Sequence, residues 1–191
     1  MVGVDKEERL ATPWLRSFRS RHPWLQLNLL TAFLAAGVVG IFQGTINRIV
    51  LLAIFLPVLS GQSTNTGCQS LAVALRGLTL GELRAGRRRA LVMKEALLGL
   101  LNGTFVGVTA GIAMYFFATS QKSPAALSLG LVVFAAMAGS CVIAGVSGAL
   151  IPMVLKRFGA DPATASSIFL TTAADVASLG FFLGLATLFV P

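Results

Sequence analysis

The chain is poor in charged residues, and this scarcity excludes an ordinary water-soluble domain. Only 12% of its 191 residues are Asp, Glu, Lys or Arg, whereas 55% are hydrophobic and the mean hydropathy is +0.83. A soluble domain carries about 25% charged residues, so a surface this poor in charge does not face water on all sides. Lipid must solvate much of the protein, and one compact membrane domain is expected at this length.

Histidine and cysteine are also scarce, which argues against a zinc or copper site. His22 is the single histidine and lies in a basic tail, whereas Cys68 and Cys141 fall in apolar stretches and imply no disulfide framework. In a soluble protein, the net charge of +8 would suggest nucleic acid as a partner. Here the basic residues lie where membrane topology would place them and are not interleaved with aromatic residues, so no nucleic-acid partner is expected.

Five long apolar segments predict an all-α polytopic membrane protein embedded in a lipid bilayer. A spanning helix needs about 20 mostly apolar residues. The segments that qualify are 24–42, 49–75, 90–117, 125–155 and 163–190. Residues 24–191 are therefore expected to form a domain of five transmembrane helices. Residues 1–23 form a basic cytoplasmic segment, interpreted either as an amphipathic helix on the inner leaflet or as a solvated tail.

The distribution of basic residues predicts the orientation of these helices. Five spans place the two termini on opposite sides, and all but two of the 15 lysines and arginines then share the side of the N-terminus. The exceptions are Arg48 and Lys122. Because cytoplasmic loops are enriched in Lys and Arg, we expect a multi-pass protein of the cytoplasmic (inner) cell membrane, with its N-terminus inside and its C-terminus outside.

The third segment carries a ladder of glycines, each four residues after the last. Its members are Gly99, Gly103, Gly107 and Gly111. Residues four apart lie on nearly the same helix face, so the ladder predicts close packing of another helix. Glu95 lies one turn before this ladder on the same face, near the predicted cytoplasmic end. It is interpreted either as part of a functional mouth or as a solvated helix end.

The fifth segment holds an acidic residue, Asp175, near its centre. An aspartate at that depth costs about 2.5–3.5 kcal/mol on translocon scales. Polar residues recur around it at helical spacing: Thr164, Ser167, Thr171, Asp175 and Ser178. With Thr172, this stripe favours a water-lined cation path, whereas the alternative is a neutral, hydrogen-bonded Asp175.

Asp161 precedes Pro162, which is typical of a helix cap, and is interpreted as that cap or as a cytoplasmic mouth that attracts cations.

The second segment is unusually polar for a spanning helix. Pro57 removes one backbone hydrogen bond, and Gly61 and Gly67 are expected to loosen the helix further. Such a helix is tolerated at membrane depth where it lines a water-filled cavity. Neutral oxygens together with one carboxylate suit Mg²⁺, which keeps several of its waters when bound. The expected metal-binding residues are Asp175, Asn65, Thr171, Gln69 and Glu95, and the expected pore-lining or structural residues are Pro57, Gly61, Gly67, Thr172 and Ser167.

At this segment the sequence resembles the membrane domain of the MgtE magnesium transporters and of the related eukaryotic solute-carrier magnesium transporters. The family pattern is a proline, six residues and then Gly-Asn-x-Gly-x-Gln, with Arg-Gly soon after. The matching residues are Pro57, Asn65, Gly67, Gln69, Arg76 and Gly77. Thr64 stands where the family usually has glycine, which bears on the pore width and the helix path there. The first and fifth segments also resemble the family, although Gln43 replaces a common glutamate, and Asp175 matches the aspartate of its central ion site.

The resemblance implies a homodimer of five-span protomers, with no enzymatic activity. The pore would lie at the dimer interface, lined by the second and fifth helices, with a largely hydrated Mg²⁺ held between two Asp175 carboxylates. Typical members also carry a cytoplasmic N-terminal domain and a CBS domain that senses magnesium. Only residues 1–23 precede the first segment here. The expectation is that these domains are lacking, so that gating is absent, intrinsic or supplied by an unknown regulatory partner.

Three other interpretations stay open at the level of sequence. One is an exchanger that couples Mg²⁺ or another divalent metal to Na⁺ or H⁺, which the residues do not distinguish from a channel. Another is an intramembrane enzyme, although the chain shows no paired carboxylates or nucleophile–base set within one protomer. The last is an assembly subunit whose glycine ladder serves only helix packing.

Overall fold

The structure, a computed structural model, describes residues 4, 8–83 and 85–190, and this part of the chain is helical with no strand. Lys6 and Arg84, counted above among the basic residues, lie outside the described residues, as do the side chains of Ala85 and Thr164. In chain order the helices are α1 (Trp14–Ile41), α2 (Gln43–Arg48), α3 (Leu51–Thr79), α4 (Ala85–Ser120), α5 (Ala126–Arg157) and α6 (Pro162–Phe189).

The helices α3 to α6 lie within a few residues of the predicted segments, whereas α1 begins well before residue 24. It starts at Trp14, directly after Pro13, and runs through Pro23 to Ile41. The backbone amides of Arg16 and Ser17 donate to the carbonyl of Pro13, so the first turn is closed upstream of the predicted boundary. The basic segment is therefore continuous with the first predicted span.

Four helices are long and apolar enough to cross a membrane: α1, α4, α5 and α6. The remaining predicted span, the second segment, is α3, which has sufficient length at 29 residues but carries the polar run described above. The chain is thus an all-helical protein with several membrane-spanning helices by length and composition. A membrane span formed by α3, which would bring the number of spans to five, and the orientation stay predictions.

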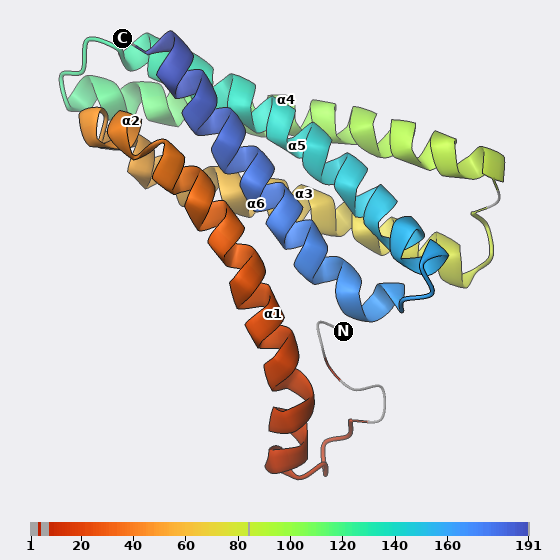
Figure 1. The fold of residues 1–191 in the computed structure, drawn as a ribbon. Coiled ribbons are helices and arrows are strands. Elements are labelled where there is room, and N and C mark those ends of the chain that lie inside the picture. The colour runs from red at the N-terminus through yellow and green to blue at the C-terminus, as the bar shows by residue number, and fades with distance from the viewer. Residues whose placement is uncertain (1–3, 5–7, 84, 191) are drawn as a thin grey trace.

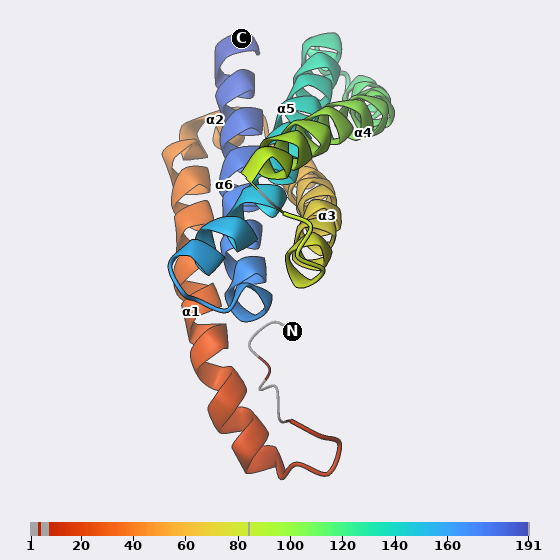
Figure 2. The same ribbon diagram turned by 90° about the vertical axis from the view of Figure 1, so that its right-hand side faces the viewer.

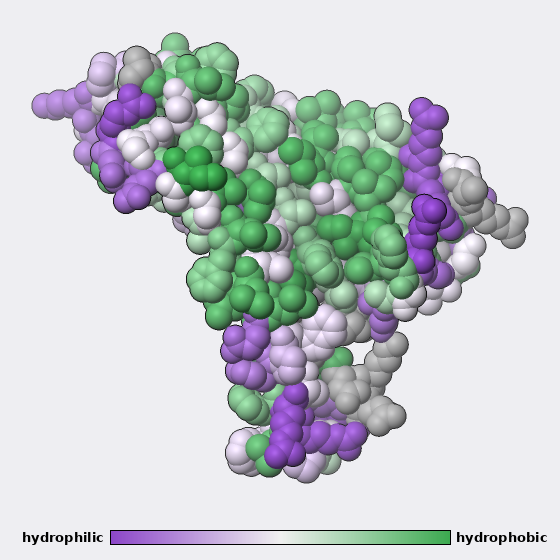
Figure 3. Space-filling view, viewed as in Figure 1, coloured by the Kyte–Doolittle hydropathy of each residue, from purple (hydrophilic) through white to green (hydrophobic). Residues whose placement is uncertain are grey.

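The helix α5 lies at the centre of the bundle and contacts α3, α4 and α6 (Figures 1 and 2). It supplies much of the hydrophobic core, including the fully buried Leu129, Val133 and Met137. Outside this bundle, α1 packs on α6 with its C-terminal half and projects away from it with its N-terminal half (Figure 1). The face seen in Figure 3 is largely hydrophobic, with hydrophilic residues gathered at its ends, as expected for a protein solvated by lipid.

The glycine ladder of α4 packs against α5, which confirms its predicted function. A Cβ atom added at Gly103 would lie 2.8 Å from the Cβ of Cys141, and one added at Gly111 would lie 2.7 Å from the carbonyl oxygen of Gly130. At Gly99 the added atom would collide with the carbonyl oxygen of Cys141. The two backbones are in contact, which is how membrane helices associate without a hydrophobic driving force.

The helix α3 is continuous through Pro57, so the expected loosening of the helix is not seen. Pro57 lies in the second turn of α3, where it removes a single backbone hydrogen bond. Gly61 has no neighbouring atom within 4 Å of an added Cβ, whereas Gly67 packs closely. At Gly67, α3 meets both α5 and α6: an added Cβ would lie 3.2 Å from the carbonyl oxygen of Ala144 and 2.7 Å from the Cδ1 of Leu170.

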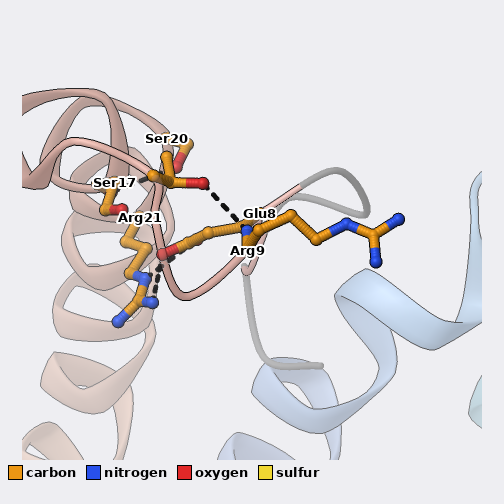
Figure 4. A network of polar contacts seen from close by, with 6 residues as sticks. Glu8, Arg9, Ser17, Ser20 and Arg21 are labelled. Carbon is orange, nitrogen blue, oxygen red and sulfur yellow. Dashed lines mark hydrogen bonds and ion pairs between the residues drawn. The ribbon is translucent and has the colours of Figure 1, made fainter.

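Residues 8–13 fold back so that Glu8 lies against the first turns of α1 (Figure 4). Glu8 accepts hydrogen bonds from the guanidinium of Arg21, and these bonds together with one from Ser17 hold the pKa of Glu8 below its ordinary value. The rings of Phe18 and His22 stack with centroids 4.9 Å apart. Trp14 is 78% exposed, so an apolar ring is free to enter the inner leaflet, and the amphipathic interpretation stays a prediction.

We expect this fold-back contact to weaken at acid pH. Because the folded state lowers the pKa of Glu8, the contact is complete above the ordinary carboxyl value and is lost as pH falls through the lowered value. At neutral pH, Glu8→Gln should increase the rate of tryptic cleavage after Arg9 by about twofold to fivefold, the scale of an exposed ion pair. Glu82→Gln, in an exposed turn elsewhere, should not change that rate. Equal cleavage of native protein and Glu8→Gln would contradict the contact.

Candidate cation site

The Asp175 carboxylate of α6 points to α3, where two hydroxyl groups meet one of its oxygens. Ser60 Oγ donates to Asp175 Oδ1 at 2.5 Å, and Thr64 Oγ1 lies 3.4 Å from the same oxygen. Ser60 and Thr64 are four residues apart and therefore share a face of α3. The contact of Gly67 with Leu170, on the same side of α3, holds the two helices together near this site.

No basic side chain in the described part of the chain forms an ion pair with Asp175. The ion pair found among these residues is that of Arg21 with Glu8, far from the site. Both hydroxyls approach Oδ1, and Oδ2 has no hydrogen bond among the described residues. A hydrogen bond to a charged group stabilises it by about 1.5–3 kcal/mol, so the hydroxyls offset much of the cost of the carboxylate without neutralising its charge. Asp175 is only half-buried, and this leaves the charge available to a cation.

Three other hydroxyls of the α6 stripe donate to their own helix. Thr171 donates to the carbonyl of Ser167 at 2.9 Å, and Thr172 donates to that of Ile168 at 2.9 Å. Ser178 likewise donates to the carbonyl of Asp175. Ser167 Oγ is buried and has no partner among the residues that the structure describes. Since a hydroxyl that donates one bond keeps its lone pairs, Thr171 and Thr172 can still present oxygen to an ion or its waters.

The structure does not bring all the predicted metal residues together in one protomer. Asn65 and Gln69 are exposed on α3, and the hydrogen bonds that Asp175 accepts from described residues of this helix come instead from Ser60 and Thr64. Asn65 follows Thr64 and is therefore turned from it by about 100° around the helix. Gln69 instead lines a separate groove that it shares with Glu95 of α4. Asp175, Thr171 and Thr172 thus lie in one place, and Gln69 and Glu95 in another.

Asp161 caps α6, which confirms the structural interpretation of this residue. Its Oδ1 accepts a hydrogen bond from the amide of Ala163 at 3.1 Å, and Pro162 is the first residue of the helix. An aspartate cap of this kind satisfies one of the free amides at the start of a helix. The cap fixes where α6 begins, and its use as a cation mouth stays a prediction.

Comparison with known proteins identifies the family. The MgtE family model, described as a divalent cation transporter, matches residues 56–185, which include α3 from its second turn and α6 past Asp175. The chain belongs to the MgtE family. The family membership predicted from the sequence motifs is thus confirmed, and this family comprises transporters rather than enzymes.

Three relatives named magnesium transporter MgtE match most or all of the chain. The protein of Enterococcus faecalis is 32% identical over 190 residues, which is 100% of this chain and 40% of that protein. The protein of Bacillus subtilis is 32% identical over 89% of this chain and 36% of its own length. That of Thermus thermophilus is 31% identical over 92% of this chain and 36% of its own length. The chain therefore spans about two fifths of the length of these MgtE relatives.

Ser60 is a site residue that the sequence interpretation missed. The available signal was its position four residues before Thr64, on the α3 face that also holds Gly67. The sequence favoured Asn65 and Gln69 as ligands, because their amide oxygens reach further from the helix. The shorter hydroxyl side chains of Ser60 and Thr64 instead fit the close contact between α3 and α6. Ser60 is half-buried and donates the shorter of the two bonds to Asp175.

Thr64, which replaces the usual MgtE glycine, places an additional hydroxyl beside the carboxylate. At 3.4 Å its contact with Asp175 Oδ1 is at the long end for an O–H···O hydrogen bond. The side chain is half-buried and α3 stays continuous around it. The substitution therefore changes what surrounds Asp175 and leaves the path of the helix regular.

Proposed function

We propose that this MgtE-family chain carries Mg²⁺ across the cytoplasmic membrane through a pore at a homodimer interface lined by α3 and α6. The observation that supports this most is the surroundings of Asp175. Its carboxylate lies in the middle of an apolar helix, accepts hydrogen bonds from neutral hydroxyls and has no basic partner in the described part of the chain. Intramembrane carboxylates of this kind mark ion pathways.

Mg²⁺ is the ion that fits this set of oxygens best. It dehydrates reluctantly and is bound through one or two carboxylates with several waters retained. Two Asp175 carboxylates would attract the hydrated ion, while Thr171 and Asn65 contact its waters. Each of these contacts is weak enough for the ion to dissociate again. The relatives that carry the name magnesium transporter support the same choice of ion.

The exposure of the pathway residues favours a second protomer at this face. Asp175 and Thr171 are half-buried and Asn65 is exposed in the single chain. A polar surface of this kind facing lipid would be costly. A second copy placed against α3 and α6 would enclose these residues in a shared water-filled path, with α1 and α4 left in contact with lipid.

Flux measurements separate a channel from an exchanger. Purified protein in liposomes should take up Mg²⁺ when an inside-negative potential alone is imposed, since a divalent ion gains about 4.6 kcal/mol per 100 mV. Imposed Na⁺ or H⁺ gradients without a potential should add nothing. If uptake instead requires one of those gradients, the chain is an exchanger. No uptake under any of the three conditions would refute transport by this chain.

Ser60→Ala should weaken Mg²⁺ handling without loss of the fold. The substitution removes the shorter hydrogen bond to Asp175 and with it the fixed orientation of the carboxylate. We expect the Mg²⁺ concentration for half-maximal flux to rise about tenfold or more, because one hydrogen bond to a charged group contributes about 1.5–3 kcal/mol. Ser63→Ala is the matched control, because the Ser63 hydroxyl donates within α3 to the carbonyl of Ser60. Equal behaviour of the two variants would show that Ser60 does not position Asp175.

A further inference from the structure

A second polar site lies in a groove of about 120 Å³ between α3 and α4. Thr66 and Gln69 line it from α3, and Lys94, Glu95 and Asn102 line it from α4. The walls are completed by the apolar residues Val73, Leu98 and Gly99. The groove thus combines one carboxylate with a hydroxyl and two amides in an apolar surrounding.

Glu95 is the unexplained member of this groove. It is 5% exposed, and its Oε1 is buried without a hydrogen-bond partner in the described part of the chain. Its backbone packs on α5, where a Cβ added at Gly145 would lie 2.7 Å from the carbonyl oxygen of Glu95. A buried carboxylate oxygen without a partner is costly, so Oε1 offers an open position to a cation or a water bound in the groove.

The neighbouring lysine does not supply that cation. Lys94 and Glu95 are consecutive on α4, and consecutive helical residues do not face each other. No ion pair joins the two among the residues described, and Lys94 is exposed. Its long side chain can extend along the groove and place the ammonium in water beyond the predicted cytoplasmic end of α4.

The remaining groups in the groove suit a hard, hydrated cation. The Thr66 hydroxyl donates to the carbonyl of Gln62 at 3.1 Å and lies 3.5 Å from Cys141 Sγ. With one proton and two lone pairs, it keeps a lone pair that can accept from an ion's water or bind an ion. Gln69 and Asn102 can each present an amide oxygen. A water occupies about 30 Å³ of liquid, so the groove has room for an ion with part of its hydration shell. Neither histidine nor cysteine lines it, which disfavours zinc and copper.

This groove is distinct from the Asp175 site in position. Thr64 contacts Asp175 whereas Thr66 lines the groove. Two residues turn an α-helix by about 200°, so the two sites lie on opposite faces of α3. Gln69 is also about 7.5 Å further along the helix axis than Thr64, in the direction of the predicted cytoplasmic end.

We propose that the α3–α4 groove binds a second divalent cation, with Glu95 as its charged ligand and Thr66, Gln69 and Asn102 as neutral oxygen ligands to the ion or its waters. This inference takes only the class of ion, a divalent cation, from the proposed function. The helices α3 and α4 contact each other little and both pack on α5. A cation in the groove ties them together, and because α3 also carries Ser60 and Thr64, it fixes the helix that positions Asp175.

Mn²⁺ binding counted by electron paramagnetic resonance tests this site on the purified full chain in detergent. Native protein should bind Mn²⁺ at the Asp175 site and additionally at the groove. Glu95→Gln should weaken groove binding about tenfold or more while the Asp175 site is retained. Asp175→Asn should do the reverse. The control is Glu82→Gln, an exposed glutamate in the turn between α3 and α4, which should bind as the native protein does.

Two results would overturn the inference. One is equal Mn²⁺ binding by Glu95→Gln and the native protein, because Glu95 would then be a structural group and not a ligand. If Glu95→Gln does not fold, Asn102→Leu is the substitute, since Asn102 is exposed; unchanged Mn²⁺ binding in that variant is the second. A different result would count against the proposed function and leave the groove site standing. In that case Glu95→Gln removes Mn²⁺ binding, whereas Asp175→Asn does not change it.

Discussion

Asp175→Asn is expected to reduce Mg²⁺ flux in proteoliposomes by at least about 100-fold, to the level of protein-free liposomes. The amide has the size of the carboxylate and can still accept the hydrogen bonds of Ser60 and Thr64. What it lacks is the negative charge that attracts the ion. The fold should therefore persist, with an unchanged elution profile and an unfolding temperature equal to or above that of the native protein, because a charge has been removed from a half-buried position.

The control for this prediction is Asp161→Asn, which removes one negative charge at the start of the same helix. Asparagine caps helices about as well as aspartate, so α6 should begin where it does now and flux should stay within about twofold of native. Flux in Asp175→Asn that equals the native flux would remove Asp175 from the pathway. Loss of flux in Asp161→Asn alone would place the critical charge at the cytoplasmic mouth.

Gly148→Ala is expected to lower the unfolding temperature by about 3–10 °C, which corresponds to an overpacking cost of about 1–3 kcal/mol. The new methyl group would collide with the carbonyl oxygen of Gly67 and lie 2.9 Å from the Cβ of Ser70. Both belong to α3, and the contacts at Gly67 and Ser70 involve backbone or Cβ atoms that no rotamer change can move. The methyl group must separate α5 from α3, which also breaks the bond from Ser70 Oγ to the carbonyl of Gly145 at 2.7 Å.

Gly61→Ala is the matched control on α3. An added Cβ there has no neighbour within 4 Å, and alanine favours a helix over glycine by up to about 1 kcal/mol. Its unfolding temperature should equal or exceed that of native protein. Thermal unfolding in detergent, followed by size-exclusion chromatography, measures both variants. An unchanged temperature for Gly148→Ala would show that α3 and α5 are not in backbone contact.

Apolar length and glycine spacing were sufficient to predict most of the helical framework. The segments that became α3 to α6 were found because a spanning helix needs a long apolar run, and the packing of α4 on α5 followed from glycines four residues apart. The N-cap at Asp161 was predicted from Asp-Pro alone. The predicted span began at residue 24, and α1 continues upstream of it to Trp14, because the segment before Pro23 is helical although it is too polar for a span.

The partners of Asp175 were harder to predict, because they depend on how α3 is rotated about its axis. Composition identified α3 as polar and Asp175 as the unusual charge, but periodicity alone did not show which polar face of α3 meets α6. Close packing at Gly67 turns Ser60 and Thr64 to Asp175 and leaves Asn65 exposed. The same rotation places Gln69 beside Glu95, on the opposite side of α3.

The most direct test of this account is the position of a bound ion in the membrane-embedded protein. Mn²⁺ replaces Mg²⁺ and scatters anomalously, so crystals of the native protein grown with Mn²⁺ would show where it lies. We predict a peak next to the Asp175 carboxylate, at a distance that leaves room for a water between them, and no such peak in Asp175→Asn. Mn²⁺ peaks elsewhere in the protein, with none near Asp175, would contradict the claim that this carboxylate lies in the cation pathway.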